Sequence, residues 1–454
     1  MGGRTPVPAR VYLHTLGCPK NEADSRALQR SLAGSSISFV QDPAEATHVV
    51  VNTCGFIQDA KEESIGAILD ACAAYPGKAV LAVGCLVERY MEELRGEIPE
   101  VKGWLGLVEG AGASRFRELV ESVQGGEVAG AERTDSAESG AAGQAVPEAG
   151  RSFAYLKISD GCDEPCTFCA IPGIKGGYHS FSAEEIVREA KACLAEGARE
   201  LVLVGQDTSL WTGDGMGLTG LVDLLAADER VTRIRVMYLQ PEHVTDELLE
   251  YMATHPKLCS YLDIPFQHAN AEVLTRMGRW GDGSDYLQLL DRARRLMPTV
   301  SARSAFIVGF PGENDRQFEE LLAFVEDAAF DYAGGFIYSP EEGTAAATLK
   351  PRVRKAVARD RLNRLEALLA YGAEQKHQAL VGVKVAVMID SLDPEDIDEG
   401  VTAIGRTEGQ APEVDGVTYI EGRLPAGTGV GDVVTVLVTA AAGYDLVGKC
   451  DDAS

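Results

Sequence analysis

The sequence lacks a hydrophobic run long enough to cross a membrane. No apolar stretch approaches the ~18 residues that a membrane helix needs, and residues 1–10 contain no apolar segment of the kind that directs secretion. We therefore expect a cytoplasmic protein without a membrane partner. With 454 residues, of which 45% are hydrophobic, the chain is long enough for two or three globular domains.

Positive charge is also scarce. The chain has 42 Lys and Arg against 69 Asp and Glu, a formal net charge of −27. Such a balance repels phosphate backbones and attracts basic partners, although solubility alone explains many acidic proteins. The charge therefore serves only as a secondary argument about the partner.

The ten cysteines do not form the pattern of a disulfide scaffold. Small secreted domains carry such scaffolds, whereas a reducing cytosol keeps thiols free. Cysteines with clustered spacing in a long chain of this kind point to metal binding or catalysis.

Residues 9–123 are predicted to form an α/β domain with a parallel sheet. Residues 49–51 and 79–83 are continuous β-prone runs, as expected of strands buried on both faces, and residues 65–72 between them have helical spacing. Strand–helix alternation of this kind is typical of a parallel sheet. Residues 124–150 are rich in Gly, Ala, Ser and Glu, so we expect a flexible acidic linker there.

Residues 151–377 are predicted to form the next domain, in which residues 151 to about 350 repeat a strand followed by a helix about six times. Ser182 with Glu185, and Asn314 with Gln317, have the spacing of capping boxes that start helices. The strand candidates are 154–158, 200–204, 233–238, 260–264, 304–309 and 334–338. Six such units predict a partial (β/α)6 barrel whose site lies at the carboxyl ends of the strands.

Residues 378–450 change character. Valines alternate with other residues at 383–389 and again at 434–438, and turn residues separate the runs. This pattern predicts a small antiparallel β-barrel. The expected fold class is thus α/β, with a third, all-β domain.

The first cysteine group is Cys162, Cys166 and Cys169, on one loop directly after a predicted strand. Three thiolates at this spacing can hold three irons of a 4Fe-4S cluster and leave the fourth iron open. The alternatives are a zinc site or stray core cysteines. Zinc would need a fourth Cys or His nearby, and structural zinc motifs usually contain two Cys-x2-Cys pairs.

The second group is Cys18, Cys54 and Cys85, each directly after a predicted strand and each beside a glycine. Since the carboxyl ends of parallel strands lie at one edge of a sheet, the three thiols should converge there. The alternative is three separate core cysteines, because free Cys is often buried. Cys72 and Cys193 lie on apolar helix faces and are expected in the core, while Cys259 and Cys450 have no evident partner.

These motifs resemble the methylthiotransferase family of radical S-adenosylmethionine enzymes. Residues 16–21 (LGCPKN), 52–57 (NTCGFI) and 84–85 (GC) resemble the family's N-terminal domain. Residues 161–172 (GCDEPCTFCAIP) resemble its radical domain, and the β module from 378 to 450 resembles its TRAM domain. The resemblance covers nearly the whole chain except residues 124–150.

The resemblance implies two 4Fe-4S clusters and two molecules of S-adenosylmethionine per turnover. One S-adenosylmethionine would donate a methyl group to sulfur at the cluster of Cys18, Cys54 and Cys85. The other, at the second cluster, would be cleaved by one electron to a 5′-deoxyadenosyl radical that removes a hydrogen from the substrate. A donor such as flavodoxin or ferredoxin would supply the electron.

The resemblance also implies contacts to S-adenosylmethionine. Gly205, Gln206 and Asp207 occupy the place where many radical enzymes carry a Gly-Gly-Glu turn, from which this chain departs. Gly309 and Glu313 belong to a glycine-rich stretch expected along the adenosine, and Phe168 precedes the last cysteine of its loop. Both stretches could instead be ordinary turns at strand ends.

The family divides into enzymes that modify an adenosine in transfer RNA and enzymes that modify an aspartate of a ribosomal protein. Residues 18–21, 56–64 and 263–268 resemble the second, RimO branch, which acts on the β-carbon of an aspartate in small-subunit ribosomal protein twelve. From residue 378 onward there are four Lys or Arg against fourteen Asp or Glu, a balance that suits a basic protein better than RNA.

Two alternatives remain open. A transfer RNA adenosine methylthiotransferase would use the basic helix predicted over residues 352–364. A non-catalytic iron–sulfur or zinc scaffold would have the cysteines without the reaction. We expect the basic ribosomal protein as substrate and do not expect nucleic acid as the primary substrate.

Overall fold

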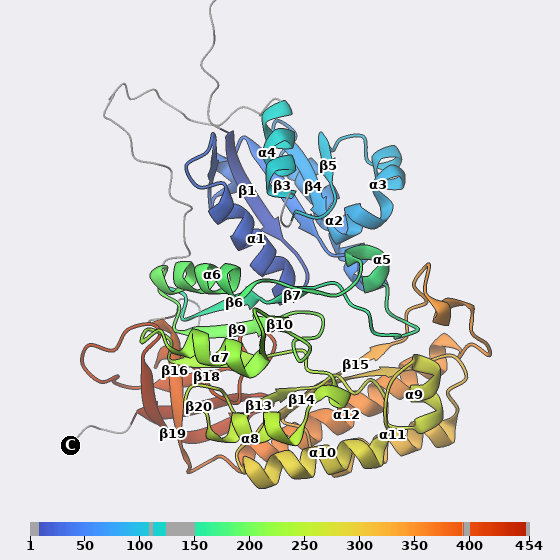
Figure 1. Cartoon of the computed structure of the whole chain (residues 1–454), viewed down its shortest axis with the longest axis vertical. Coiled ribbons are helices and arrows are strands. Elements are labelled where there is room, and N and C mark those ends of the chain that lie inside the picture. Colours follow the sequence, from blue (N-terminus) through green and yellow to red (C-terminus); the bar gives the residue numbers. More distant parts are fainter. Residues whose placement is uncertain (1–8, 109–111, 124–149, 393, 395–399, 451–454) are drawn as a thin grey trace, which may run out of the picture. The chain divides into compact units, whose positions relative to one another are not determined.

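The computed structural model describes residues 9–108, 112–123, 150–392, 394 and 400–450. The chain divides into two units, Met1–Glu148 and Ala149–Ser454, which we describe separately and call unit 1 and unit 2 (Figure 1). The linker predicted over residues 124–150 lies almost entirely outside the described residues.

A five-stranded parallel sheet forms the centre of unit 1, in the order β2-β1-β3-β4-β5. Its strands are β1 (Ala9–Thr15), β2 (Ile37–Phe39), β3 (His48–Thr53), β4 (Ala79–Gly84) and β5 (Gly103–Leu105). Every residue of β3 and β4 is buried, which explains their continuous apolar sequence. The parallel sheet is confirmed, whereas β2 and β5 were too short to be predicted.

Helices cover both faces of this sheet. They are α1 (Pro19–Ser31), α2 (Gln58–Ala74), α3 (Cys85–Glu97) and α4 (Gly112–Ser122). Val49 of β3 packs with residues of α2 and α3, whereas its neighbour Val50 packs with residues of α1 and α4. Because successive strand residues point to opposite faces, each face has its own apolar core.

Six parallel strands form the barrel of unit 2. They are β6 (Phe153–Lys157), β9 (Glu200–Val204), β12 (Arg233–Val236), β13 (Tyr261–Asp263), β14 (Ser301–Val308) and β15 (Tyr332–Ile337). They pair as β6-β9-β12 and β13-β14-β15, and a parallel bridge between Ile234 and Leu258 links the two halves. All six strands were predicted, and the partial barrel is confirmed.

Helices accompany these strands. They are α5 (Ile171–Lys175), α6 (Ala183–Ala195), α7 (Leu218–Ala226), α8 (Asp246–Thr254), α9 (Ala271–Met277), α10 (Gly283–Leu296), α11 (Asp315–Ala328) and α12 (Lys355–Gln378). Both predicted capping boxes are present at the starts of α6 and α11. The short antiparallel pair β7 (Ser159–Asp160) and β8 (His179–Ser180) was not predicted. The hairpin of β10 (Thr212–Gly213) and β11 (Met216–Gly217) was not predicted either.

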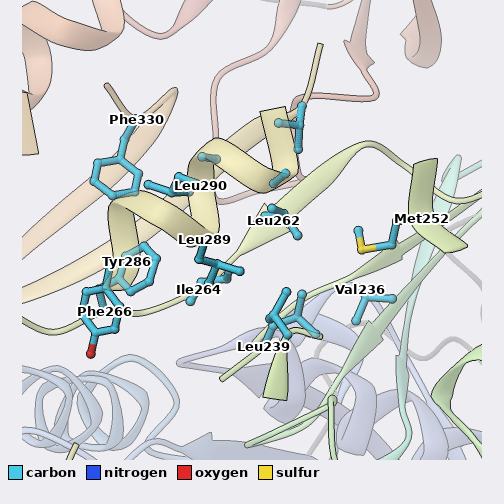
Figure 2. Packing of buried hydrophobic residues seen from close by; sticks show 14 of the residues in the cluster. Val236, Leu239, Met252, Leu262, Ile264, Phe266, Tyr286, Leu289, Leu290 and Phe330 are labelled. Carbon is cyan, nitrogen blue, oxygen red and sulfur yellow. The ribbon is translucent and has the colours of Figure 1, made fainter. Parts of the chain in front are cut away.

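The barrel core is filled by side chains from strands and helices together. Figure 2 shows Leu262 and Ile264, at and just after β13, facing Leu289 of α10. Phe266 stacks on Tyr286 with ring centroids 4.3 Å apart and an interplanar angle of 30°. Both rings are fully buried, so this end of the barrel is a packed core.

The C-terminal strands of unit 2 form a closed barrel in the order β16-β17-β18-β20-β19. They are β16 (Lys384–Leu392), β17 (Val401–Thr407), β18 (Thr418–Glu421), β19 (Val433–Ala442) and β20 (Asp445–Cys450). Val387, Ile389 and Val436 point into its core, as the alternating sequence predicts. The predicted α/β fold with a C-terminal β-barrel is thereby confirmed. The barrel is not wholly antiparallel as predicted, because β18 and β20 pair in parallel.

A buried ion network joins the two barrels of unit 2. Glu200 of β9 accepts from Arg235 Nε at 2.7 Å and from Arg406 Nη1 of β17 at 2.8 Å. Burial by itself would raise the pKa of Glu200, but Arg235, Arg406 and Arg233 lower it to about 2. The C-terminal barrel therefore packs on the larger barrel through charges that are desolvated and paired.

Within the described ranges, no helix combines the length and the apolar character needed to span a bilayer.

Candidate functional site

The loop that follows β7 brings Cys162, Cys166 and Cys169 together, a set that we call the radical trio. The amide of Cys162 donates to the carbonyl of Gly176 at 3.2 Å, and the amide of Cys169 donates to the carbonyl of Cys166 at 3.2 Å. The three thiols are close enough that Cys162 and Cys166 contribute to raising the pKa of Cys169. The predicted local grouping is therefore present.

The C-terminus of α9 supports this loop. Thr167 donates its amide to the carbonyl of Met277 at 2.9 Å and its Oγ1 to the carbonyl of Arg276 at 2.7 Å. Gly278 ends the helix with φ 69°, and a Cβ on it would lie 2.3 Å from the carbonyl oxygen of Pro165. Thr167 thus satisfies carbonyls that a helix end leaves without partners, and the glycine allows the two backbones to approach.

Arg279, directly after that glycine, reaches the radical trio. Its Nη1 donates to Cys166 Sγ at 3.7 Å and its Nη2 donates to the carbonyl of Pro265 at 2.9 Å. The side chain is buried, so its positive charge acts on the thiol through little solvent. Sequence reasoning missed Arg279 because it lies more than a hundred residues beyond Cys166.

Burial is the largest influence on the pKa values of these three thiols. It raises the pKa of Cys162 to about 11 and of Cys169 to about 12. Burial also raises the pKa of Cys166, where Arg279 acts in the opposite direction. The free thiols are therefore protonated at neutral pH, and binding a metal group must release their protons.

The donor set of the radical trio suits an iron–sulfur cluster. Three thiols on one loop offer soft sulfur ligands to three irons of a 4Fe-4S cluster. The buried Arg279 beside Cys166 would balance part of the negative charge that the bound thiolates bring.

Asp207, predicted as a cofactor contact, lies near the radical trio with Glu164 and His243. The ligand atoms of the three lie within 4.8 Å of one another, and His243 Nδ1 is 3.1 Å from Asp207 Oδ2. Asp207 is fully buried, and burial raises its pKa. This group offers acceptors to a cation, and sequence reasoning missed Glu164 and His243.

Two of the other predicted contacts follow the end of β9. A Cβ on Gly205 would lie 2.4 Å from Ser159 Oγ, and Gln206 is half-buried. Phe168, on the cysteine loop, is half-buried and packs against the barrel core.

Glu313 closes its own turn. Its Oε2 accepts from the amides of Phe310, at 2.9 Å, and of Gly309, and its Oε1 lies 3.2 Å from Arg361 Nη1. Burial raises the pKa of Glu313, while Arg361 acts against it. The Glu313 side chain is fully buried, so its carboxylate stabilises the glycine-rich turn from within.

In unit 1, Cys18, Cys54 and Cys85 come from three separate strand ends, and we call them the N-terminal trio. Cys18 precedes α1, Cys54 follows β3, and Cys85 is the first residue of α3 after β4. A Cβ on Gly17, whose φ is 95°, would lie 2.7 Å from Cys54 Cβ, so only glycine allows the first loop this close to the second. Burial raises the pKa of Cys54, and Cys18 adds to the rise.

The remaining cysteines lie apart from both trios. Cys193 and Cys259 are buried, Cys72 is half-buried beside the core of unit 1, and Cys450 packs against the core of the C-terminal barrel. Their placement agrees with the core role expected for Cys72 and Cys193.

Three family models match the chain in order. Residues 10–106 match the Uncharacterized protein family UPF0004, residues 156–325 match the Radical SAM superfamily, and residues 381–450 match the TRAM domain. The superfamily match implies a 4Fe-4S cluster and S-adenosylmethionine as cofactors. The order of the three matches is the order that the sequence resemblance implied.

Whole-chain relatives decide the family. The chain is 40% identical to "Ribosomal protein uS12 methylthiotransferase RimO" of Moorella thermoacetica, over 97% of this chain and 99% of that protein. The protein of the same name from Thermotoga maritima is 38% identical, over 97% of this chain and 99% of its own. The chain belongs to the RimO family. It is a radical S-adenosylmethionine methylthiotransferase, as the resemblance implied.

A solved structure supports the fold of this RimO-family chain at greater distance. The radical S-adenosylmethionine methyltransferase TsrM from Kitasatospora setae, determined with cobalamin and a [4Fe-4S] cluster, superposes with a TM-score of 0.52. The match covers 85% of this chain and 81% of that one at 14% identity. At this identity the likeness concerns the fold alone.

Proposed function

We propose that this RimO-family chain inserts a methylthio group at the β-carbon of an aspartate in ribosomal protein uS12. The name shared by its relatives supports the protein substrate, and the resemblance of residues 18–21, 56–64 and 263–268 supports the aspartate. The proposal assigns residues 9–123 to sulfur insertion, 151–377 to radical formation, 378–450 to substrate docking and 124–150 to a linker.

The proposal places one 4Fe-4S cluster on each cysteine trio. The radical trio offers three thiols on one supported loop, and the N-terminal trio offers three thiols at one sheet edge. When bound, these clusters and S-adenosylmethionine would supply sulfur and the one-electron chemistry that activates a carbon–hydrogen bond. A small protein such as flavodoxin or ferredoxin would deliver the electron.

The residues of the chain hold and orient these groups. The thiols lose their protons as they become ligands, and Arg279 stabilises the resulting negative charge at Cys166. Asp207 and Glu164 would attract the ammonium group of S-adenosylmethionine, and the buried Asp207 orients His243.

The acidic charge of the C-terminal barrel favours a protein substrate over RNA. Of the four Lys and Arg that follow residue 378, Arg406 is buried against Glu200, and Lys449 lies 3.5 Å from Glu421. RNA binding depends mainly on cationic contacts to phosphate, which this barrel is poorly equipped to make. An acidic module instead complements a basic ribosomal protein.

Helix α12 contains the basic residues that the transfer RNA alternative would use, and two of its arginines have a structural role instead. Arg361 of α12 is 4% exposed and pairs with Glu313 and Asp315. Arg364 pairs with Glu319 at 2.7 Å, and both guanidinium groups lie over the ring of Phe318. These two arginines therefore attach α12 to α11, which removes much of the basis for RNA binding there.

The test is a substrate assay with reconstituted enzyme, reductant and S-adenosylmethionine under anaerobic conditions. Purified uS12 and unmodified transfer RNA are incubated separately and analysed by mass spectrometry. We expect a methylthio group on one aspartate of uS12 and none on RNA. Methylthio gain on RNA alone would overturn the proposal, and uS12 with its candidate aspartate changed to alanine is the matched control.

A further inference from the structure

One buried amide side chain lies where the three loops of the N-terminal trio meet. Asn21 is 4% exposed and belongs to the first turn of α1, three residues after Cys18. An amide at this depth must have partners, because an unpaired buried polar group costs about 1–3 kcal/mol. The identity of its partners therefore shows what it holds.

Asn21 joins the first two cysteine loops. Its Nδ2 donates to the carbonyl of Leu16 at 2.9 Å and to the carbonyl of Thr53 at 3.2 Å. Leu16 stands two residues before Cys18, and Thr53 stands directly before Cys54. Both amide hydrogens are thus used, one on each loop.

The same side chain also touches the third loop. Cys85 Sγ lies 3.9 Å from Asn21 Oδ1, in the geometry of a weak S–H···O bond, and the backbone amide of Asn21 donates to the carbonyl of Cys18 at 2.9 Å. One residue therefore contacts all three segments, which are separated by more than thirty residues from one another in the chain.

The surroundings leave little choice of side chain at this position. A Cβ on Gly17 would lie 3.5 Å from Asn21 Nδ2 and 3.1 Å from Cys54 Sγ, so the loops are already in close contact. Aspartate has the same shape but no hydrogen to donate to either carbonyl, and serine is too short to bridge two of them.

We propose that Asn21 is a positioning residue that holds the three cysteine loops together before any cluster binds. The inference rests on the proposed second cluster at this trio. Its consequence is that uptake of metal depends on an amide that is not itself a ligand, as partners of metal ligands commonly affect affinity by about 10–100-fold.

The test isolates the N-terminal trio in the full-length chain. In a reference variant, Cys162, Cys166 and Cys169 are changed to alanine, so bound metal reports on Cys18, Cys54 and Cys85. Asn21→Asp and Asn21→Ser are added to this reference. Thr47→Val is the matched control. Thr47 is also buried in unit 1, and its Oγ1 bonds the backbone N–H and carbonyl of Arg10 at 2.9 and 3.0 Å, at the amino ends of the strands.

Two readouts are independent of catalysis. Titration with Co²⁺ follows the absorption of thiolate-bound cobalt, and anaerobic reconstitution is followed by iron and sulfide analysis. We expect about four irons per chain in the reference and in Thr47→Val. Asn21→Asp should bind Co²⁺ about 10–100-fold more weakly and hold substantially less iron. Circular dichroism identifies any variant that fails to fold, and Asn21→Ser then provides the comparison.

The outcomes separate this inference from the proposed function. If folded Asn21→Asp and Asn21→Ser bind cobalt and iron as the reference does, Asn21 is not a positioning residue, while the second cluster stands. If the reference itself takes up no iron, the second cluster falls, and the inference falls with it.

Discussion

The two cysteine trios offer the same three thiols but are built in different ways. The radical trio lies within eight consecutive residues, on a loop that Thr167 attaches to the end of α9. The N-terminal trio collects one cysteine from each of three strand ends, with Asn21 between the loops. Three cysteine ligands can thus be brought together either by one short loop or by the strand order of a sheet. In each case other residues hold the loops in place.

Cysteine substitutions should give the largest difference between the two trios in the products that the enzyme forms. Cys166→Ala should abolish formation of 5′-deoxyadenosine and of product, because the radical trio loses a ligand. Cys54→Ala should retain 5′-deoxyadenosine formation but give no methylthio product. Chromatography of the nucleoside and mass spectrometry of uS12 measure both.

Cys72→Ala is the control, since Cys72 lies outside both trios. If Cys166→Ala still forms 5′-deoxyadenosine, the radical trio is assigned wrongly. If Cys54→Ala yields normal product, the N-terminal trio has no part in sulfur insertion.

Glu200→Gln tests how much the buried ion network between the two barrels stabilises unit 2, where the radical trio lies. Breaking a buried pair that leaves a charge unpaired costs about 3–5 kcal/mol. Here Arg235 loses its carboxylate partner, while Arg406 retains Asp390. Denaturant unfolding measures the loss, with Glu229→Gln, an exposed glutamate, as control. A change below about 1 kcal/mol would contradict the importance of this network.

The same residue predicts a pH dependence. Because the pKa of Glu200 falls from 4.5 to about 2 on folding, its ionised form stabilises unit 2 above pH 4.5. That contribution, about 3 kcal/mol, is lost as the pH falls from 4.5 toward 2. Acid unfolding of Glu200→Gln should lack this part of the pH dependence, and an unchanged acid transition would count against it.

Arg279→Gln tests the cation beside the radical trio. Loss of a positive charge next to Cys166 should shift the reduction potential of its cluster to a more negative value. Radical formation should fall by about 10–100-fold, and Arg279→Lys should recover part of it. Potentiometric titration provides the measurement. Arg294→Gln is the control, since Arg294 Nη2 donates to the backbone carbonyls of Ala328 and Ala329.

Thr167→Val should have the smallest effect. It removes one hydrogen bond to the carbonyl of Arg276 and keeps the shape of the side chain, so unit 2 should lose about 1 kcal/mol. Iron retention at the radical trio on dilution should also decrease. Thr254→Val, which removes an exposed hydroxyl bond on α8, is the comparison, and equal retention in both would show that the loop needs no such support.

Much of the fold could be predicted because its signals are local. Barrel strands such as β6 and β9 contain short apolar runs. Ser182 and Asn314 begin their helices through hydrogen bonds within four residues. The strands β2 and β5 could not be predicted, since three residues carry too little pattern and pair only because the sheet already exists.

The motif at residues 263–268 shows why a family signal differs from a contact. Asp263 accepts from Arg303 at 2.9 Å and from the amide of Tyr238 at 3.0 Å. His268 is fully buried, and burial lowers its pKa to about 3. The motif that resembles the RimO branch therefore belongs in good part to the buried framework of the barrel, and sequence alone could not reveal this.

The sequence by itself determined the radical trio, because thiols three and four residues apart must share one loop wherever that loop lies. It also determined the acidity of the C-terminal barrel, since composition does not depend on folding. Only the tertiary structure placed Arg279 beside Cys166, Asn21 among three distant loops and Arg406 inside an interface. These contacts join residues far apart in the chain, and such pairs meet only after the strands have set the geometry.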